Sequence, residues 1–320
     1  MTWFLLTLAC IILWGITDLL YRAASDQDDP LSHYKIFIWI GIVMAVAGCI
    51  MSTWSDTLPD TINMVKGDVL YLVPLCLVYA AALFFGLLGK KYLYASVISP
   101  LENIDGAMGI LIIYFYYLLT GYIHPDYTFG AMDLIAAVSI IAGVVILGRQ
   151  EQELLKQESH LSDDKKKHRF GALALCFPLI YNLADVFSVA EISGIVSGSA
   201  EGTIPAIDFF ILECAGFVLV TVCMWLYLLI VKKYAYNPFD EGELIRCGAA
   251  TGETFGTMTF LLAAGINPVL TGPVTSSYCI VTIILARIFL KERLTKKQYI
   301  SLAFLLFGIA LLGISDIFNV

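Results

Sequence analysis

Apolar and polar residues alternate along this chain in long blocks, with ten apolar segments separated by short polar gaps. The segments run at about residues 3 to 23, 34 to 54, 69 to 89, 97 to 120, 130 to 148, 170 to 192, 205 to 231, 243 to 265, 269 to 290 and 297 to 315. Each comes close to the roughly 20 residues that a helix needs to cross the hydrocarbon core of a bilayer. Strands of a membrane barrel would instead alternate in polarity over about ten residues. The pattern therefore predicts an all-α polytopic membrane protein with ten transmembrane helices.

Lys and Arg residues occur almost entirely in every second gap. If the amino terminus lies outside, all of the 19 basic residues except Lys66 fall at gaps on the cytoplasmic side. Positive charge collects in cytoplasmic loops of membrane proteins. We therefore expect a multi-pass protein of the cell (plasma or inner) membrane with both termini outside and the polar stretch 149–169 in the cytoplasm.

Composition agrees with lipid as the solvent, since 59% of the residues are hydrophobic and only 14% are charged. The net charge of −8 comes with acidic loops and no basic groove, which argues against nucleic acid as a partner. The eight cysteines show no Cys-x-x-Cys spacing and are interpreted as small packing residues.

Weak internal similarity suggests that the chain is a duplication. The polar linker 149–169 divides a first half, 1–148, from a second half, 170–320. Matching features are LACIILWGITD against ALCFPLIYNLAD, Ser99-Pro100 against Gly272-Pro273, and Gly143 and Gly148 against Gly308 and Gly313. Because each half would hold an odd number of crossings, the copies would lie in opposite orientations, as in transporters that work by alternating access.

The stretch Gly272 to Gly313 resembles the signature of the drug/metabolite transporter (DMT) superfamily, in its ten-helix EamA-type branch. The matching elements are Pro273, the Glu-Arg-Leu turn that begins at Glu292, Gly308, and Trp14-Gly15 in the first segment. The first half departs from the pattern, because TGYIHPD replaces the expected Glu turn. The resemblance implies two inverted five-helix EamA-like halves, a central cavity, and secondary transport of small solutes.

Every ionisable residue within the central parts of the apolar segments is acidic. Charge near the bilayer centre costs at least about 2.5 to 3.5 kcal/mol, so these carboxyls should face a cavity or be protonated. The candidates for substrate or proton binding are the pair Glu102 and Asp105, which share a helix face, together with Glu253, Glu213 and the repeat-related Asp18 and Asp185. Complementing a helix dipole and hydrogen bonding between helices are the structural alternatives.

Aromatic and amide side chains near these acids extend the candidate site. Trp14, Tyr181 and Tyr278 could offer ring faces to an organic cation, although packing is the alternative for each. Asn103 and Asn182 could hydrogen-bond a polar substrate. No Lys or Arg is expected near a helix centre, which disfavours anionic substrates.

These features lead to a secondary transporter of a small organic cation, amine or zwitterionic metabolite, working by alternating access with protons as the coupling ion. The alternative is an exporter of neutral amino acids or related metabolites; a membrane scaffold or sensor that transports nothing is less favoured. An enzyme is disfavoured, since all four histidines fall in loops and no metal, cofactor or phosphate-binding motif occurs. A single chain could function as a monomer, because both halves are already fused.

Overall fold

The structure is a computed structural model, and within the residues it describes the chain is helical and contains no strand. These residues are 2–26, 29–66, 69–104, 131–132, 134–136, 138–143, 146, 149–150, 173–195, 204–240, 242–266, 268–292 and 294–318. The helices are α1 Thr2–Ala24, α2 Ser32–Ser52, α3 Leu58–Val65, α4 Val69–Tyr92, α5 Ala95–Glu102, α8 Cys176–Ile195, α9 Ala206–Ile230, α10 Leu244–Ile266, α11 Pro268–Thr275, α12 Tyr278–Leu285 and α13 Lys296–Phe318, with short 3₁₀ and π turns at Leu173–Leu175 and Ala286–Leu290.

The expected all-helical architecture is confirmed, and most long helices lie within a few residues of the predicted apolar segments. Three of the described helices, α1, α2 and α9, are long and apolar enough to cross a membrane. Large apolar side chains are exposed at helical spacing on the outer faces, for example Leu8 and Ile12 on α1 and Phe304 and Phe307 on α13. An extensive exposed apolar surface is typical of contact with lipid or another protein.

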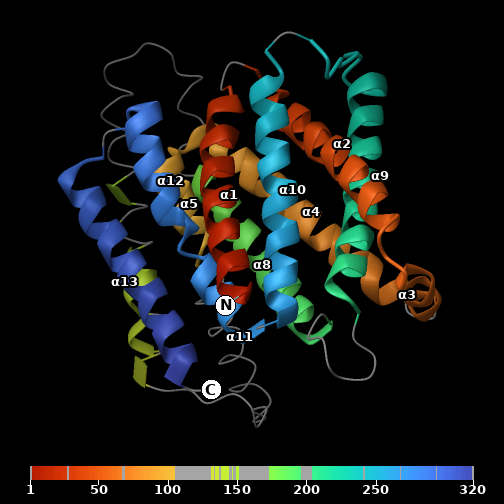
Figure 1. The fold of residues 1–320 in the computed structure, drawn as a ribbon. Helices are drawn as coiled ribbons and strands as arrows, with labels where there is room; N and C mark the ends of the chain where they lie inside the picture. The colour runs from red at the N-terminus through yellow and green to blue at the C-terminus, as the bar shows by residue number, and fades with distance from the viewer. Residues whose placement is uncertain are drawn as a thin grey trace.

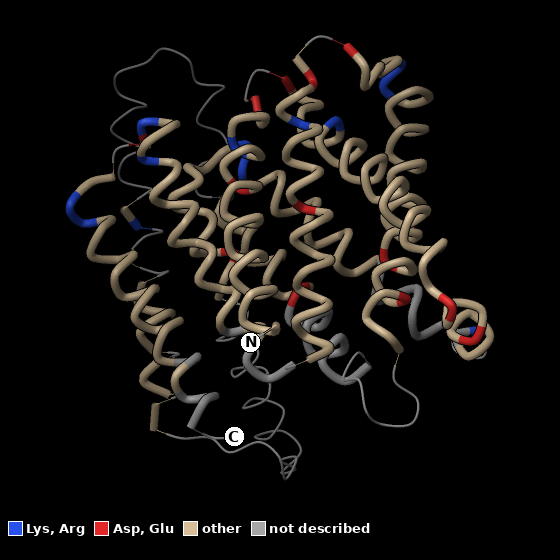
Figure 2. Tube along the Cα trace, in the orientation of Figure 1, with Lys and Arg blue, Asp and Glu red and all other residues tan. Residues whose placement is uncertain are grey.

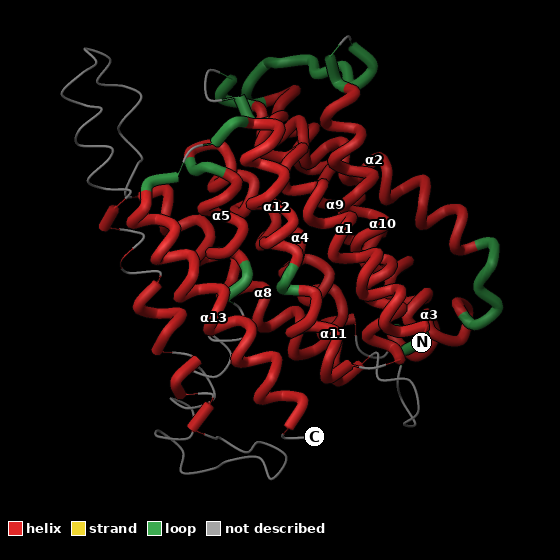
Figure 3. The backbone as a smooth tube through the Cα atoms, turned by 60° about the vertical axis from the view of Figure 1, so that its left-hand side comes forward, coloured by secondary structure: helices red, strands yellow, loops and turns green. Residues whose placement is uncertain are grey.

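Two predicted segments are interrupted in the middle of the bundle. The segment expected at 97 to 120 forms α5 and ends at Glu102, and its continuation from residue 105 lies outside the described residues. The segment expected at 269 to 290 is divided into α11 and α12 at Ser276 and Ser277. Figure 3 shows short loop segments at both places, away from the ends of the bundle.

One further boundary differs from the prediction. The helix expected to end near residue 89 continues to Tyr92, which makes Lys90 and Lys91 helical.

The acidic stretch after α2 contains a short helix that the segments did not predict, α3. It is joined to α9 through Asp208. The carboxylate of Asp208 is fully buried and accepts hydrogen bonds from the hydroxyls of Ser55, Thr57 and Thr61.

Close helix pairs organise the bundle: α1 packs along α10, α2 along α9, and α4 along α8 (Figure 1). Small residues on α10 allow α1 and α10 to pack closely. A Cβ placed on Gly256 of α10 would lie 2.4 Å from the ring of Trp14 on α1, and one on Gly252 would lie 2.1 Å from Oγ1 of Thr17. The glycines therefore let α1 approach the backbone of α10.

Basic residues gather at the end of the bundle where α1 finishes and α2 begins (Figure 2). Lys66, the basic residue directly after α3, is at the opposite end of the bundle. Helices α1, α4 and α10 run between these two ends, and together with α5, α8, α9 and α12 they carry the side chains of the candidate site.

Candidate functional site

A pocket of about 810 Å³ opens between α1, α4, α5, α8, α9, α10 and the α11–α12 interruption. The predicted residues that line it are Trp14, Asp18, Glu102, Asn103, Tyr181, Asp185, Glu213, Glu253 and Tyr278. Asn182 lies behind the wall, and Asp105 lies outside the described residues. The structure thus brings together residues that are as far apart in sequence as Trp14 and Tyr278.

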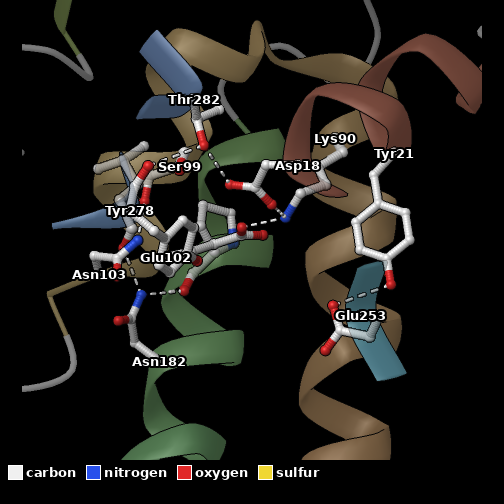
Figure 4. A network of polar contacts seen from close by, with 12 residues as sticks. Asp18, Tyr21, Lys90, Ser99, Glu102, Asn103, Asn182, Glu253, Tyr278 and Thr282 are labelled. Atoms are coloured by element: carbon white, nitrogen blue, oxygen red, sulfur yellow. Dashed lines mark hydrogen bonds and ion pairs between the residues drawn. The ribbon is translucent and has the colours of Figure 1, made fainter. Parts of the chain in front are cut away.

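The expectation that no basic side chain would be buried is wrong, because Lys90 of α4 lies in the pocket wall with 2% of its surface exposed. Its ammonium is 3.1 Å from the carboxylate of Asp18 and donates a hydrogen bond to Oε2 of Glu102 (Figure 4). Buried charges in proteins are paired in this way because an isolated ion loses its hydration. Glu102 is therefore one of two carboxylates that share a lysine; its expected pairing with Asp105 falls outside the described residues.

Glu253 lies on the other side of the pocket and is held by aromatic hydroxyls. Tyr21 of α1 donates to its Oε2 at 3.1 Å, and Tyr79 of α4 donates to its Oε1 at 2.6 Å. Thr257, one turn along α10, is 3.4 Å from the same Oε1. Figure 4 shows the hydroxyl of Tyr21 pointing toward Glu253, with Asp18, Lys90 and Glu102 grouped to the left of both.

Two buried carboxylate oxygens have no hydrogen-bond partner among the described residues. They are Oε2 of Glu213 and Oε1 of Glu102, and each parent side chain is 2% exposed. A buried polar atom left unpaired costs about 1–3 kcal/mol, and more when it is charged. Such atoms in a pocket wall are where a ligand that donates hydrogen bonds would be stabilised.

Aromatic rings form part of the remaining wall. The ring of Trp14 lies 5.3 Å from that of Phe260 and 5.6 Å from that of Tyr278, measured between centroids, and the second pair meets edge to face. The indole N–H of Trp14 has no acceptor within the described parts of the chain. These rings suit the hydrocarbon part of a ligand or an ammonium group.

The helix interruptions bring polar groups to the pocket. The amide of Asn103, just after α5, donates to the carbonyl of Ser99 at 2.7 Å. Asn182 of α8 donates to the carbonyl of Leu101 at 2.5 Å, which makes it a support for α5 rather than a lining residue. At the other interruption, Thr275 and Ser276 bond the carbonyl of Gly272 at 2.8 and 3.1 Å. At the end of α5 the two amides thus satisfy carbonyls that the helix leaves free, whereas the Gly272 carbonyl also accepts the backbone N–H of Ser276.

Glu292, from the Glu-Arg-Leu turn, holds the start of α5. Its carboxylate accepts hydrogen bonds from the backbone N–H groups of Ala95 and Ser96, at 2.9 and 3.0 Å, and from the Ser96 hydroxyl at 2.5 Å. These are donors that a helix amino terminus leaves unpaired, and negative charge is favourable there. The turn therefore fixes the helix that carries Glu102.

A network of charged side chains lies at the basic end of the bundle. Asp29 accepts from Lys35 at 2.8 Å and lies 4.0 Å from Arg246, while its backbone carbonyl accepts from Lys91 at 2.6 Å. Arg246 also donates to Glu243 at 2.5 Å. Partial burial alone would raise the pKa of Asp29, but the hydrogen bonds from Lys35 and from the Leu31 N–H outweigh it and hold that pKa below its usual value. The network ties the loop after α1 to α2, α4 and α10.

Sequence reasoning missed Lys90, Tyr21 and Tyr79, although helical spacing contained the signal. Tyr79, Leu83 and Lys90 recur at intervals that keep them on one face of α4, and all three line the pocket. Tyr21 continues the face of α1 that carries Trp14 and Asp18. Lys90 was assigned to a loop because the apolar run ends before it, whereas the helix continues through it.

The fold and the site together define a class: a bundle of helices with apolar outer faces and a charged pocket in its interior. A scan of protein-family models finds no match to the chain, and a search of curated proteins finds none either. A crystal structure described only as that of a protein is similar to it, with a TM-score of 0.51 and 14% sequence identity over 96% of this chain and 95% of that chain. At this identity the similarity concerns the fold alone, and it extends over nearly the whole of both chains.

Proposed function

We propose that this chain is a ten-helix secondary transporter of the EamA type in the DMT superfamily. It would move a small organic cation, amine or zwitterionic metabolite across the cell membrane by alternating access, with protons as the coupling ion. The observation that carries the proposal is the pocket, in which Lys90 pairs with Asp18 and Glu102 while Glu213 and Glu253 line the same wall, inside a bundle with apolar outer faces.

Helix packing supports the duplicated architecture. If the two halves correspond in chain order, α1 matches α8, α2 matches α9 and α4 matches α10. The pair α1–α10 then matches the pair α8–α4, and both pairs are closely packed. The pair α2–α9 matches itself with the two helices exchanged. A repeat related by a two-fold axis requires this pattern of partners.

The two interrupted segments support the same correspondence. Helices α5 and α11 are both 8 residues long, and Ser99-Pro100 and Gly272-Pro273 occupy the same positions within them. In transporters built from inverted repeats, discontinuous helices border the substrate site. Here Asn103 and Ser276, which follow α5 and α11, both line the pocket.

Charge distribution supports a membrane orientation with the basic end in the cytoplasm. The pocket extends from Lys90, near that end, toward α11 at the opposite end. The network around Asp29 closes over the basic end. In the proposed cycle this network separates when the pocket opens to the cytoplasm.

Proton coupling follows from the buried carboxyls. A carboxyl that binds an ammonium must be ionised. When no cation is bound, a buried carboxyl is favoured in the neutral, protonated form while the protein changes conformation. Proton and cation therefore compete for Glu253 or Glu213, and competition at one site gives exchange across the membrane.

Export of neutral amino acids or related metabolites is the second candidate, and Lys90 is the basic side chain among the described lining residues that could receive their carboxylate. This function requires the α-carboxylate to displace Asp18 or Glu102 from the Lys90 ammonium, while the amino group bonds a pocket acid. A scaffold or sensor would have no need of exchange at this pocket.

The test is reconstitution of the full chain in liposomes that enclose a pH-sensitive dye. Addition of an amine substrate should drive proton movement, and Glu253→Gln should abolish it while thermal unfolding stays cooperative. Asp56→Asn, which removes an exposed acid from the loop before α3, is the matched control and should transport normally. If no amine, zwitterion or neutral amino acid moves protons or enters the vesicles, transport is not the function.

A further inference from the structure

Lys90 offers little to an incoming anion, because its ammonium is already engaged. It bonds Asp18 and Glu102, and it lies 5.8 Å from the centre of the Tyr21 ring. A ligand carboxylate would have to displace one of two carboxylates that are nine-tenths or more buried. The triad of Asp18, Lys90 and Glu102 is therefore interpreted as an internally paired group rather than a vacant anion site.

The unpaired groups of the wall that carry charge are instead acceptors, and the neutral indole N–H of Trp14 is an unpaired donor beside them. Oε1 of Glu102 and Oε2 of Glu213 belong to pocket-lining side chains and have no partner in the described portion of the protein. An ammonium group carries three N–H donors and a positive charge, so it suits a carboxylate oxygen that lacks a partner. Each of the two positions can receive one ammonium.

The two positions are on different sides of the pocket. Glu102 is joined to Lys90, whereas Glu213, on α9, lies within electrostatic reach of Glu253 on α10. Tyr21 contacts both groups, since the Lys90 ammonium lies 5.8 Å from its ring centre and its hydroxyl donates to Glu253 (Figure 4). Two ammonium groups joined by a hydrocarbon chain can pair with one acid each.

The wall between the two positions is largely apolar. Trp14, Phe260, Tyr278 and Leu261 line the pocket and contribute ring faces and aliphatic surface. Such a surface stabilises methylene groups by removing them from water. A ligand with charged ends and an apolar middle matches this arrangement.

We propose that the pocket binds a linear α,ω-diamine, with one ammonium on Glu213 beside Glu253 and the other on Glu102. This substrate class rests on the proposed function and narrows it. The binding step itself requires neither transport nor a coupling ion.

The test compares three ligands that each contain four carbons and differ at one end only: putrescine, butylamine and γ-aminobutyrate. Calorimetric titration of the purified full chain should give putrescine at least about tenfold tighter binding than butylamine, a difference of about 1.4 kcal/mol. Binding of γ-aminobutyrate should be weaker than that of putrescine. Equal affinity for putrescine and butylamine, or tighter binding of γ-aminobutyrate, overturns the proposal without any variant.

Two isosteric variants then locate the ammonium positions. Glu213→Gln and Glu102→Gln should each reduce the preference for putrescine over butylamine to about threefold or less, since each removes one charged acceptor. Asp56→Asn should leave the preference unchanged. If both pocket variants unfold cooperatively and retain the full preference, the diamine does not bridge these acids and the assignment is wrong.

Liposome flux separates this inference from the proposed function. Proton exchange driven by monoamines or neutral amino acids but not by putrescine would overturn the diamine assignment and leave the transporter intact. Tight, selective putrescine binding without flux of any solute would overturn transport and leave the ligand assignment standing.

Discussion

At the scale of single residues, the feature that most affects the chemistry is Lys90. The segment-based prediction treated it as a cytoplasmic loop residue, whereas the structure pairs it with two acids in the pocket wall. This pairing changes which carboxylates are available to a ligand. Glu213 and Glu102 each keep one carboxylate oxygen without a partner among the described residues, whereas Glu253 accepts from Tyr21 and Tyr79.

Replacing Lys90 should destabilise the protein strongly. Lys90→Met leaves Asp18 and Glu102 buried without a counter-ion, and removing one partner of a buried ion pair costs about 3–5 kcal/mol. Adding Glu102→Gln should recover part of that loss, because a neutral amide replaces one buried charge. Denaturant unfolding in detergent measures both effects, with Lys66→Met on an exposed lysine as control. Unchanged stability of Lys90→Met would show that the ion pairs contribute nothing.

Asp29 gives a prediction about pH at the basic end. Its pKa is lower in the folded protein than in the unfolded chain, so its contribution to stability is present above the usual value of about 3.9 and lost as pH falls through the folded value. Asp29→Asn should therefore lower the unfolding temperature at neutral pH, and the difference from wild type should vanish in strong acid. Unfolding curves across pH measure this. A difference that persists or grows in acid contradicts the assignment.

At the scale of elements, close approach and interruption of helices position the site. α1 lies against the glycines of α10, which brings Trp14, Asp18 and Tyr21 toward Glu253. Glu292 fixes the start of α5, and Asn182 supports its end near Leu101. The pocket residues are therefore held by contacts that lie outside the pocket itself.

The glycines of α10 provide a matched pair of substitutions. A methyl group at Gly256 would lie 2.4 Å from the Trp14 ring, whereas one at Gly248 meets only a side-chain atom of Leu20 at 3.6 Å. Gly256→Ala should cost about 1–3 kcal/mol through overpacking. Gly248→Ala should be neutral or stabilising by about 0.4–1 kcal/mol, because alanine restricts the unfolded chain. Unfolding measurements in detergent compare the two, and equal effects would show that α1 does not pack on this face.

At the scale of the whole molecule, the two ends of the bundle differ in charge. Basic residues gather at one end, and α3 with its lone basic neighbour lies at the other (Figure 2). In a membrane this asymmetry sets the orientation. The same asymmetry determines on which side of the membrane the Asp29 network would lie.

Labelling of single cysteines tests this orientation. In a cysteine-free variant, Asn63→Cys on α3 should react with a membrane-impermeant maleimide in intact cells, and Tyr234→Cys after α9 should react only after permeabilisation. Both positions are exposed in the structure. Reaction of both from the same side would contradict a bundle that spans the membrane with its basic end inside.

The sequence by itself determined the helices, because long apolar runs are a local property of the chain, and the spacing of the basic residues predicts their orientation in a membrane. It also pointed to the acids that line the pocket, since an ionisable group within an apolar run must face something other than lipid. Only the tertiary structure decided how these acids are paired. Asp18 and Lys90 meet because α1, α4 and α5 are brought together by packing at distant glycines and at the Glu292 turn, and a buried charge depends on what neighbouring helices place beside it.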